Sequence, residues 1–145
     1  MNWFAWSLLS AVFAGLTAIL AKVGVEGLSS HIATAIRTAV VLVLTCLVAV
    51  PSLRTFPLTS VSGRSWLFLI ASGAATAFSW LCYFRALQLG KASQVAPVDK
   101  MSTVIAVVLA VIFLNERLSL RGTIGVTLIV AGALLMALER PVSSQ

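Results

Sequence analysis

Long apolar runs alternate with short polar stretches along the whole chain. Five runs are long enough to cross a membrane, because about 20 apolar residues span a hydrocarbon core about 30 Å thick. They cover residues 3–21, 32–50, 65–86, 95–114 and 120–138. No water is present in the bilayer core, so each run must satisfy its own backbone hydrogen bonds, which predicts helices. The pattern therefore predicts an all-α fold, an integral membrane bundle of five transmembrane helices.

Short polar segments separate the runs, so helices that follow one another in sequence are expected to be antiparallel neighbours. Pro51 and Gly63 predict the longest loop between them, and Gly90 predicts the end of the third helix. The first run is expected to stay in the protein, because residues 1–9 lack the basic region with which a cleaved signal begins.

Composition leaves no room for a soluble domain. The chain is 60% hydrophobic and only 10% charged, whereas soluble domains carry about 25% charged residues. Residues 1–140 are therefore expected to form a single five-helix transmembrane domain, and residues 141–145 a polar C-terminal tail.

The polar residues exclude several function classes. Most of the net charge of +6 stands at helix ends, where Lys and Arg reach the lipid headgroups, so it does not indicate nucleic-acid binding. Cys46 and Cys82 stand within apolar runs without a metal-ligand spacing and are expected to be small core residues. The sequence has no nucleophile triad, metal cluster or glycine-rich phosphate loop, so we expect no enzyme, cofactor or metal.

The basic residues divide evenly between the two sides of the membrane. The side of the N-terminus, side A, carries Arg54, Arg64, Arg117 and Arg121, and side B carries Lys22, Arg85, Lys91 and Arg140. An excess of Lys and Arg in the cytoplasmic loops normally sets orientation. Equal numbers leave the direction of insertion poorly specified and allow copies in both orientations. Alternatively, these residues are ordinary helix-end anchors and the insertion machinery sets the direction.

Asp99 is the only carboxylate inside a predicted span. An ionisable group in hydrocarbon is costly, so it is retained because it is paired or because it functions. Its neighbour Lys100 points about 100° away around the helix and so has different surroundings. Arg37 lies at a similar depth in another helix that starts on side B, and its planar fork suits a carboxylate. An Arg37–Asp99 pair is therefore a candidate.

Pro97 allows two interpretations. Inside the fourth helix it would break the hydrogen-bond ladder and could help to line a solute site. As the first residue of that helix its missing N–H would cost nothing, and Asp99 would be a first-turn acid favoured by the helix dipole. Spacing alone does not decide between them.

Aromatic residues cluster on one face near the end of the third helix: Trp80, Tyr83 and Phe84. Trp80 is the candidate for a pocket wall, whereas Tyr83 and Phe84 are expected in an interfacial aromatic belt. His31 starts the second helix and is expected to be a capping or surface residue.

Small residues on the fifth helix lie on one stripe: Gly122, Gly125 and Gly132. Membrane helices associate through such stripes because small residues let backbones approach closely. Tight helix packing is therefore expected, and a dimer contact through this helix is one form that it could take.

The segments APVDKMS at residues 96–102, FLNERLS at 113–119 and LIVAG at 128–132 resemble the EamA-like domain of the drug/metabolite transporter superfamily. Many members have ten helices, built as two fused five-helix units of inverted orientation, and this chain resembles one such unit. A Gly-Glu pair is common in the family where this chain has Asn115 and Glu116. The resemblance implies transport of small organic solutes, with Pro97 and Glu116 as motif positions.

The sequence thus favours an alternating-access homodimer in a bacterial inner membrane that transports small organic solutes. Five is an odd number, so an inverted twin would restore the symmetry of a fused pair; a parallel twofold dimer is the competing arrangement. Side B is basic, which favours anionic or zwitterionic solutes. The candidate substrate-binding or coupling residues are Arg37, Asp99, Lys100, Trp80 and Pro97.

Asp99 is the candidate for proton coupling, a role that conflicts with a firm pair with Arg37. The main alternative function is a non-transporting membrane interaction subunit or scaffold, in which Arg37 and Asp99 only lock helices together. A translocator of lipid-linked carriers is a third interpretation.

Overall fold

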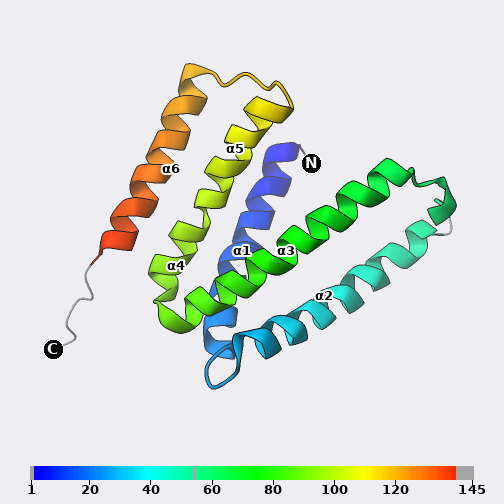
Figure 1. Ribbon diagram of the computed structural model, residues 1–145, viewed down its shortest axis with the longest axis horizontal. Helices are drawn as coiled ribbons and strands as arrows, with labels where there is room; N and C mark the ends of the chain where they lie inside the picture. The colour runs from blue at the N-terminus through cyan, green and yellow to red at the C-terminus, as the bar shows by residue number, and fades with distance from the viewer. Residues whose placement is uncertain (1, 54, 140–145) are drawn as a thin grey trace. The chain divides into compact units, whose positions relative to one another are not determined.

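The computed structural model describes residues 2–53 and 55–139. Its helices are α1 (Trp3–Gly24), α2 (Ser30–Leu53), the short η1 (Leu58–Ser60), α3 (Gly63–Leu89), α4 (Ala92–Asp99), α5 (Met101–Phe113) and α6 (Leu120–Leu138) (Figure 1). The described part of the chain contains no strand, and α4 and α5 together form the fourth span, Ala92–Phe113. All five predicted spans are confirmed as helices long and apolar enough to cross a membrane. Arg54, Arg140 and the tail at 141–145 lie outside the described residues.

The prediction that Pro51 begins the longest loop is wrong, because α2 continues through Pro51 to Leu53. Proline fixes φ near the helical value and removes only its own N–H. At the end of a helix that loss affects a single hydrogen bond of the final turns. Gly63 likewise belongs to a helix, as the first residue of α3, so the connecting segment is shorter at both ends than expected.

The chain forms two compact units. Unit 1 comprises Met1–Leu20 and Leu89–Gln145, and so holds most of α1 together with α4, α5 and α6. Unit 2 comprises Ala21–Gln88, and so holds the end of α1, α2, η1 and α3.

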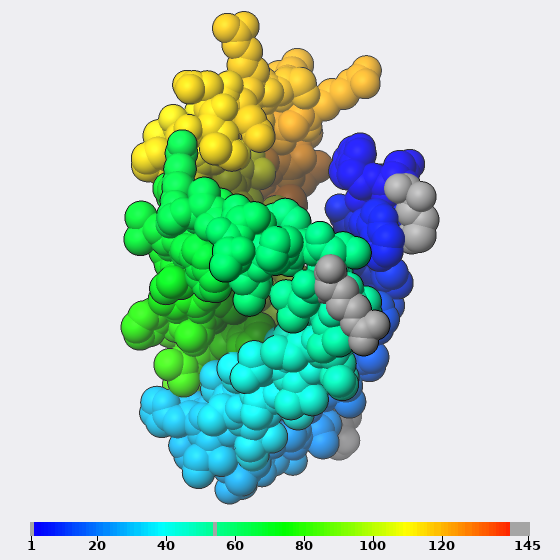
Figure 2. Space-filling model, turned by 90° about the vertical axis from the view of Figure 1, so that its right-hand side faces the viewer, coloured from blue at the N-terminus to red at the C-terminus, as the bar shows by residue number. Residues whose placement is uncertain are grey.

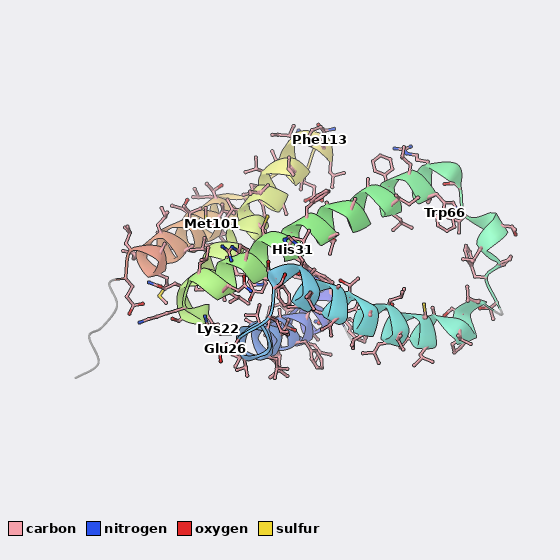
Figure 3. All side chains as sticks on the ribbon, turned by 60° about the horizontal axis from the view of Figure 1, so that its bottom comes forward. Lys22, Glu26, His31, Trp66, Met101 and Phe113 are labelled. Carbon is pink, nitrogen blue, oxygen red and sulfur yellow. The ribbon has the colours of Figure 1, made fainter. Side chains whose placement is uncertain are left out.

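Unit 2 has its core at one end, where α1 ends, α2 begins and α3 ends (Figure 1). The buried apolar residues of this end are Val25, Ala33, Phe84 and Leu87, of which Leu87 is fully buried. Figure 3 shows Lys22, Glu26 and His31 at this end and Trp66 at the other. His31 is the second residue of α2 and is exposed, as expected.

Unit 1 is held together by α6, against which α4 and α5 both pack. Ala133 is buried on α6. Gln94 of α4 donates a hydrogen bond from Nε2 to the Glu139 carbonyl, 2.7 Å away, so the start of α4 is fastened to the end of α6.

Asn115 ends α5 in the left-handed region, with φ +54°. The N–H of Leu114 and the N–H of Glu116 both donate to the Ala110 carbonyl, at 2.9 and 3.4 Å. Gly adopts this backbone at least cost, and Asn tolerates it better than most residues. The Asn-Glu pair found here in place of the Gly-Glu pair is therefore a conservative change for the backbone.

Most apolar side chains of every span lie on the surface of the described chain. At most 11% of the most apolar window of any span is buried. Figure 2 shows α2, light blue to cyan, on the face of the molecule turned toward the viewer, and its exposed apolar residues include Val40, Leu44 and Val48. Soluble proteins rarely expose contiguous apolar patches of more than a few hundred Å². Such helices require lipid or a second protein around them.

Two expectations about packing are wrong within the described residues. Cys46 and Cys82 are exposed rather than core residues. A Cβ atom built on Gly125 or Gly132 would meet no atom within 4 Å, so this part of the glycine stripe makes no close helix contact inside the described chain. Gly122 differs, since its Cβ would lie 3.5 Å from the Leu118 side chain.

Candidate functional site

Arg37 lies against aromatic rings of α3 within unit 2. Its Cζ atom is 4.2 Å from the centre of the Trp80 ring and 5.6 Å from the centre of the Phe84 ring. Both distances are within the range of about 6 Å at which a guanidinium is attracted by the π-electrons of a ring. The structure thus brings together two elements of the predicted site, the cation of α2 and the aromatic face of α3.

The expectation that Phe84 stands in an interfacial belt is wrong. Phe84 is only 4% exposed, and Tyr83 packs edge-on against it at 6.4 Å between ring centres. Trp80 is half-buried, as suits a pocket wall. Trp80 and Phe84 are four residues apart and therefore point the same way along α3, which lets one arginine contact both.

The guanidinium of Arg37 has hydrogen-bond donors that the aromatic rings do not use. An arginine carries five N–H donors in a fixed plane. Among the described residues of unit 2, none accepts a hydrogen bond from Arg37. The one carboxylate in the sequence of this unit is Glu26, at the turn between α1 and α2 (Figure 3). Tyr83 of α3 also interacts electrostatically with Arg37. Unit 2 therefore presents a half-buried cation whose neighbours on α3 are aromatic residues.

A set of side-chain hydrogen bonds, called the clasp below, joins the end of α3 to the end of α1 and to the turn after it, at the same end of unit 2. Lys22 Nζ donates to the Leu87 carbonyl at 2.6 Å, and Gln88 Nε2 donates to the Leu28 carbonyl at 2.7 Å. Arg85 in turn donates to the Gln88 side-chain oxygen at 3.1 Å. Sequence reasoning missed these bonds and treated Lys22 and Arg85 as headgroup anchors. Side-chain bonds to a backbone carbonyl require no particular partner residue, so the sequence carries no signal for them.

Pro97 lies inside α4, whose first residue is Ala92, so the interpretation of Pro97 as a first helical residue is wrong. The helix breaks three residues later at Lys100, where ψ is −7°. The Lys100 N–H is shared between the Ala96 and Pro97 carbonyls at 3.3 and 3.2 Å. Proline removes its own hydrogen bond and crowds the turn that precedes it, whereas this break lies in the turn that follows Pro97.

Asp99 is the last residue of α4 and is half-buried. It is therefore not a first-turn acid of α4, as the alternative interpretation requires, although it directly precedes Lys100, the N-cap of α5. Lys100, beside it, is exposed. Arg37 is the eighth residue of the 24-residue α2 and Asp99 the eighth of the 8-residue α4, so both lie about 10 Å along their helices. The two residues belong to different units, and the Arg37–Asp99 pair stays a prediction.

The comparisons with known proteins address the whole chain. Residues 1–138 match the model of the EamA-like transporter family. A protein of Sinorhizobium sp. named "Uncharacterized transporter in cobO 3'region" is 52% identical over 137 residues, which cover 94% of this chain and 96% of that protein.

The chain belongs to the EamA-like transporter family. A second relative, an uncharacterized protein of Methanocaldococcus jannaschii, is 30% identical over 132 residues, 91% of this chain and 93% of its own length. No solved structure matches the chain at a significant level. Together with the five membrane-spanning helices, this membership establishes a multi-pass membrane protein of a transporter family. The Sinorhizobium relative agrees with the expected location in a bacterial inner membrane.

The end of unit 2 that the clasp joins should depend on it for local order. Gln88→Leu removes the bond to the Leu28 carbonyl, and one hydrogen bond contributes about 1 kcal/mol. We expect amide hydrogen exchange in residues 25–29 to rise about fivefold. Gln94→Leu, which removes the equivalent bond in unit 1, should instead speed exchange near Glu139. Unchanged exchange in residues 25–29 of the Gln88 variant would show that the clasp is dispensable.

Proposed function

We propose that the chain is an alternating-access transporter of small organic solutes that prefers anionic or zwitterionic ones. The observation that supports this preference is Arg37, a cation within a membrane-spanning helix that lies against the rings of Trp80 and Phe84. A charge in a span is costly and marks a solute or ion pathway more often than a structural feature. A structural lock would require a partner acid, and the sequence of unit 2 offers only Glu26 at the turn.

The break at Lys100 fits this function. Transporters bind solutes where a helix is interrupted, because unwound turns expose backbone groups and helix ends to the site. Pro97 and the turn at Lys100 interrupt the fourth span in this way, with Asp99 directly before the break. Pro97, Asp99 and Lys100 therefore stay in the proposed pathway together with Arg37 and Trp80.

Asp99 is the proposed proton-coupling group. It is half-buried at the end of α4 and directly precedes the break in the fourth span. A proton that crosses with a monoanion makes the transported pair neutral, which lowers the cost of its passage.

Proteoliposomes loaded with a pH dye test the proposed solute class and the proposed proton coupling through Asp99. Benzenesulfonate and phenylalanine serve as an anionic and a zwitterionic probe. The parent protein should move at least one of them, and an imposed pH gradient should accelerate uptake. Asp99→Asn should remove the effect of the gradient while solute exchange continues. Failure to move either probe would overturn the proposed solute class, and a gradient effect that survives in the variant would eliminate coupling through Asp99.

The transporting form is proposed to be a homodimer of oppositely inserted copies. Basic residues divide evenly between the two sides, so neither direction of insertion is favoured by charge. An inverted pair would give the two-repeat symmetry on which alternating access depends. On α6 the half-buried Gly125 and the exposed Gly132 have no atom within 4 Å of an added Cβ, which leaves a face on which a second helix can approach closely.

A cysteine at Ser144, in the tail outside the described residues, reports orientation. In a Cys46→Ser, Cys82→Ser background, an impermeant thiol reagent should label Ser144→Cys from both sides of the membrane. As a control, Arg and Lys added to the tail should fix one orientation and confine labelling to one side. Labelling of the unmodified tail from one side alone would exclude the antiparallel dimer.

A further inference from the structure

We propose that Arg37 and the apolar surface beside it on α2 bind a small organic anion that combines a planar carboxylate with an apolar body. This inference rests on the proposed transport of anionic solutes and names the chemical class of solute. Two separate features of unit 2 support it, one for each part of the solute.

The carboxylate is recognised by the edge of the guanidinium. The distance of 4.2 Å between Arg37 Cζ and the centre of the Trp80 ring fits a stacked arrangement. A stacked guanidinium keeps its face on the ring and directs its N–H groups outward in one plane. A carboxylate is planar and can accept two of these bonds side by side, which makes the pair both strong and directional.

The apolar body is accommodated by a hollow along α2. Its volume is about 290 Å³, and its lining residues are Ala39, Val40, Val43 and Leu44. Val40 and Leu44 follow Arg37 by three and seven residues and lie within about 60° of it around the helix, whereas Ala39 and Val43 lie more than about 100° away. The hollow therefore begins beside the guanidinium and continues around the helix. All the lining residues of the hollow are apolar. A solute whose anionic group binds Arg37 can therefore place its apolar group against the next turns of α2.

The size of the hollow restricts the solute. Sites for small molecules commonly enclose about 300–1,000 Å³, whereas this hollow of about 290 Å³ is an open depression on the surface of one helix. A compact ring or short branched chain suits it better than a long polar molecule. An inorganic anion such as phosphate would use the charge of Arg37 but gain nothing from the hollow.

Fluorescence of Trp80 gives a direct readout of binding. The full-length protein in detergent carries Trp3→Phe, Trp6→Phe and Trp66→Phe, which replace exposed tryptophans and leave Trp80 as the only indole. Benzoate has both parts of the proposed solute, acetate only the carboxylate, and benzyl alcohol only the apolar ring. Benzoate should bind at least tenfold more tightly than acetate, benzyl alcohol or inorganic phosphate. Phosphate binding as tight as that of benzoate would overturn the proposal and assign Arg37 to a free or headgroup phosphate.

Substitutions separate the two parts of the site. Arg37→Lys keeps the charge but loses the planar fork, and should weaken benzoate binding about ten- to hundredfold. Ala39→Phe fills the hollow from an exposed position, and should weaken benzoate binding while acetate binding stays constant. Arg64→Lys is the matched control, because Arg64 also contacts a ring, that of Phe68 at 5.8 Å, but is fully outside the proposed site. Helical content by circular dichroism confirms that each variant is folded.

Parental benzoate affinity in folded Arg37→Lys would overturn the inference, whatever the transport assay shows. If the parent binds benzoate through Arg37 but moves no solute in proteoliposomes, the proposed transport fails and the binding site stands. If solute moves but benzoate binds without preference over acetate, transport stands and the solute class fails. The two proposals are therefore tested separately.

Discussion

The cost of holding an arginine within a membrane-spanning helix is the constraint on which the site depends. Burial strips water from the guanidinium, so protein groups must stabilise it or the helix would be expelled from the bilayer. The rings of Trp80 and Phe84 supply part of that stabilisation, since a partly desolvated cation–π contact contributes about 1–2 kcal/mol. They do so without using the N–H donors. The cation is thereby held in one position and still able to bind an anion, a combination that an ion pair with a fixed acid would not give.

The surrounding structure serves the same requirement. The clasp of Lys22, Gln88 and Arg85 fastens the end of α3 to the end of α1 and to the turn that leads into α2. The remaining surface of each unit is apolar and exposed, so lipid and, in the proposed dimer, an inverted copy must cover it. The break at Lys100 gives the fourth span a point at which it can bend. A fastened end and an interrupted span suit the proposed alternating access.

The helices could be predicted from the sequence because a span is defined by a long local pattern of apolar residues. All five predicted spans were confirmed. The errors at Pro51 and Gly63 concern only where a helix ends or begins, which depends on single hydrogen bonds. The site was only partly predictable. The face shared by Trp80 and Phe84 follows from helical spacing, but the burial of Phe84 and its contact with Arg37 depend on how α2 meets α3. The clasp uses backbone carbonyls, which every residue has, so local sequence does not predict it. The exposure of Cys46 depends on which helices of the described chain pack beside α2, and local sequence does not predict that either.

Replacement of Arg37 by methionine tests the central claim most directly. Methionine preserves length and apolar contact with Trp80 while removing the charge and all donors. If the arginine is kept for solute, Arg37→Met should unfold at the same temperature as the parent or higher in detergent, and should lose at least tenfold of its benzenesulfonate uptake in proteoliposomes. A lower unfolding temperature together with unchanged uptake by the folded variant would contradict the account and make Arg37 a structural residue.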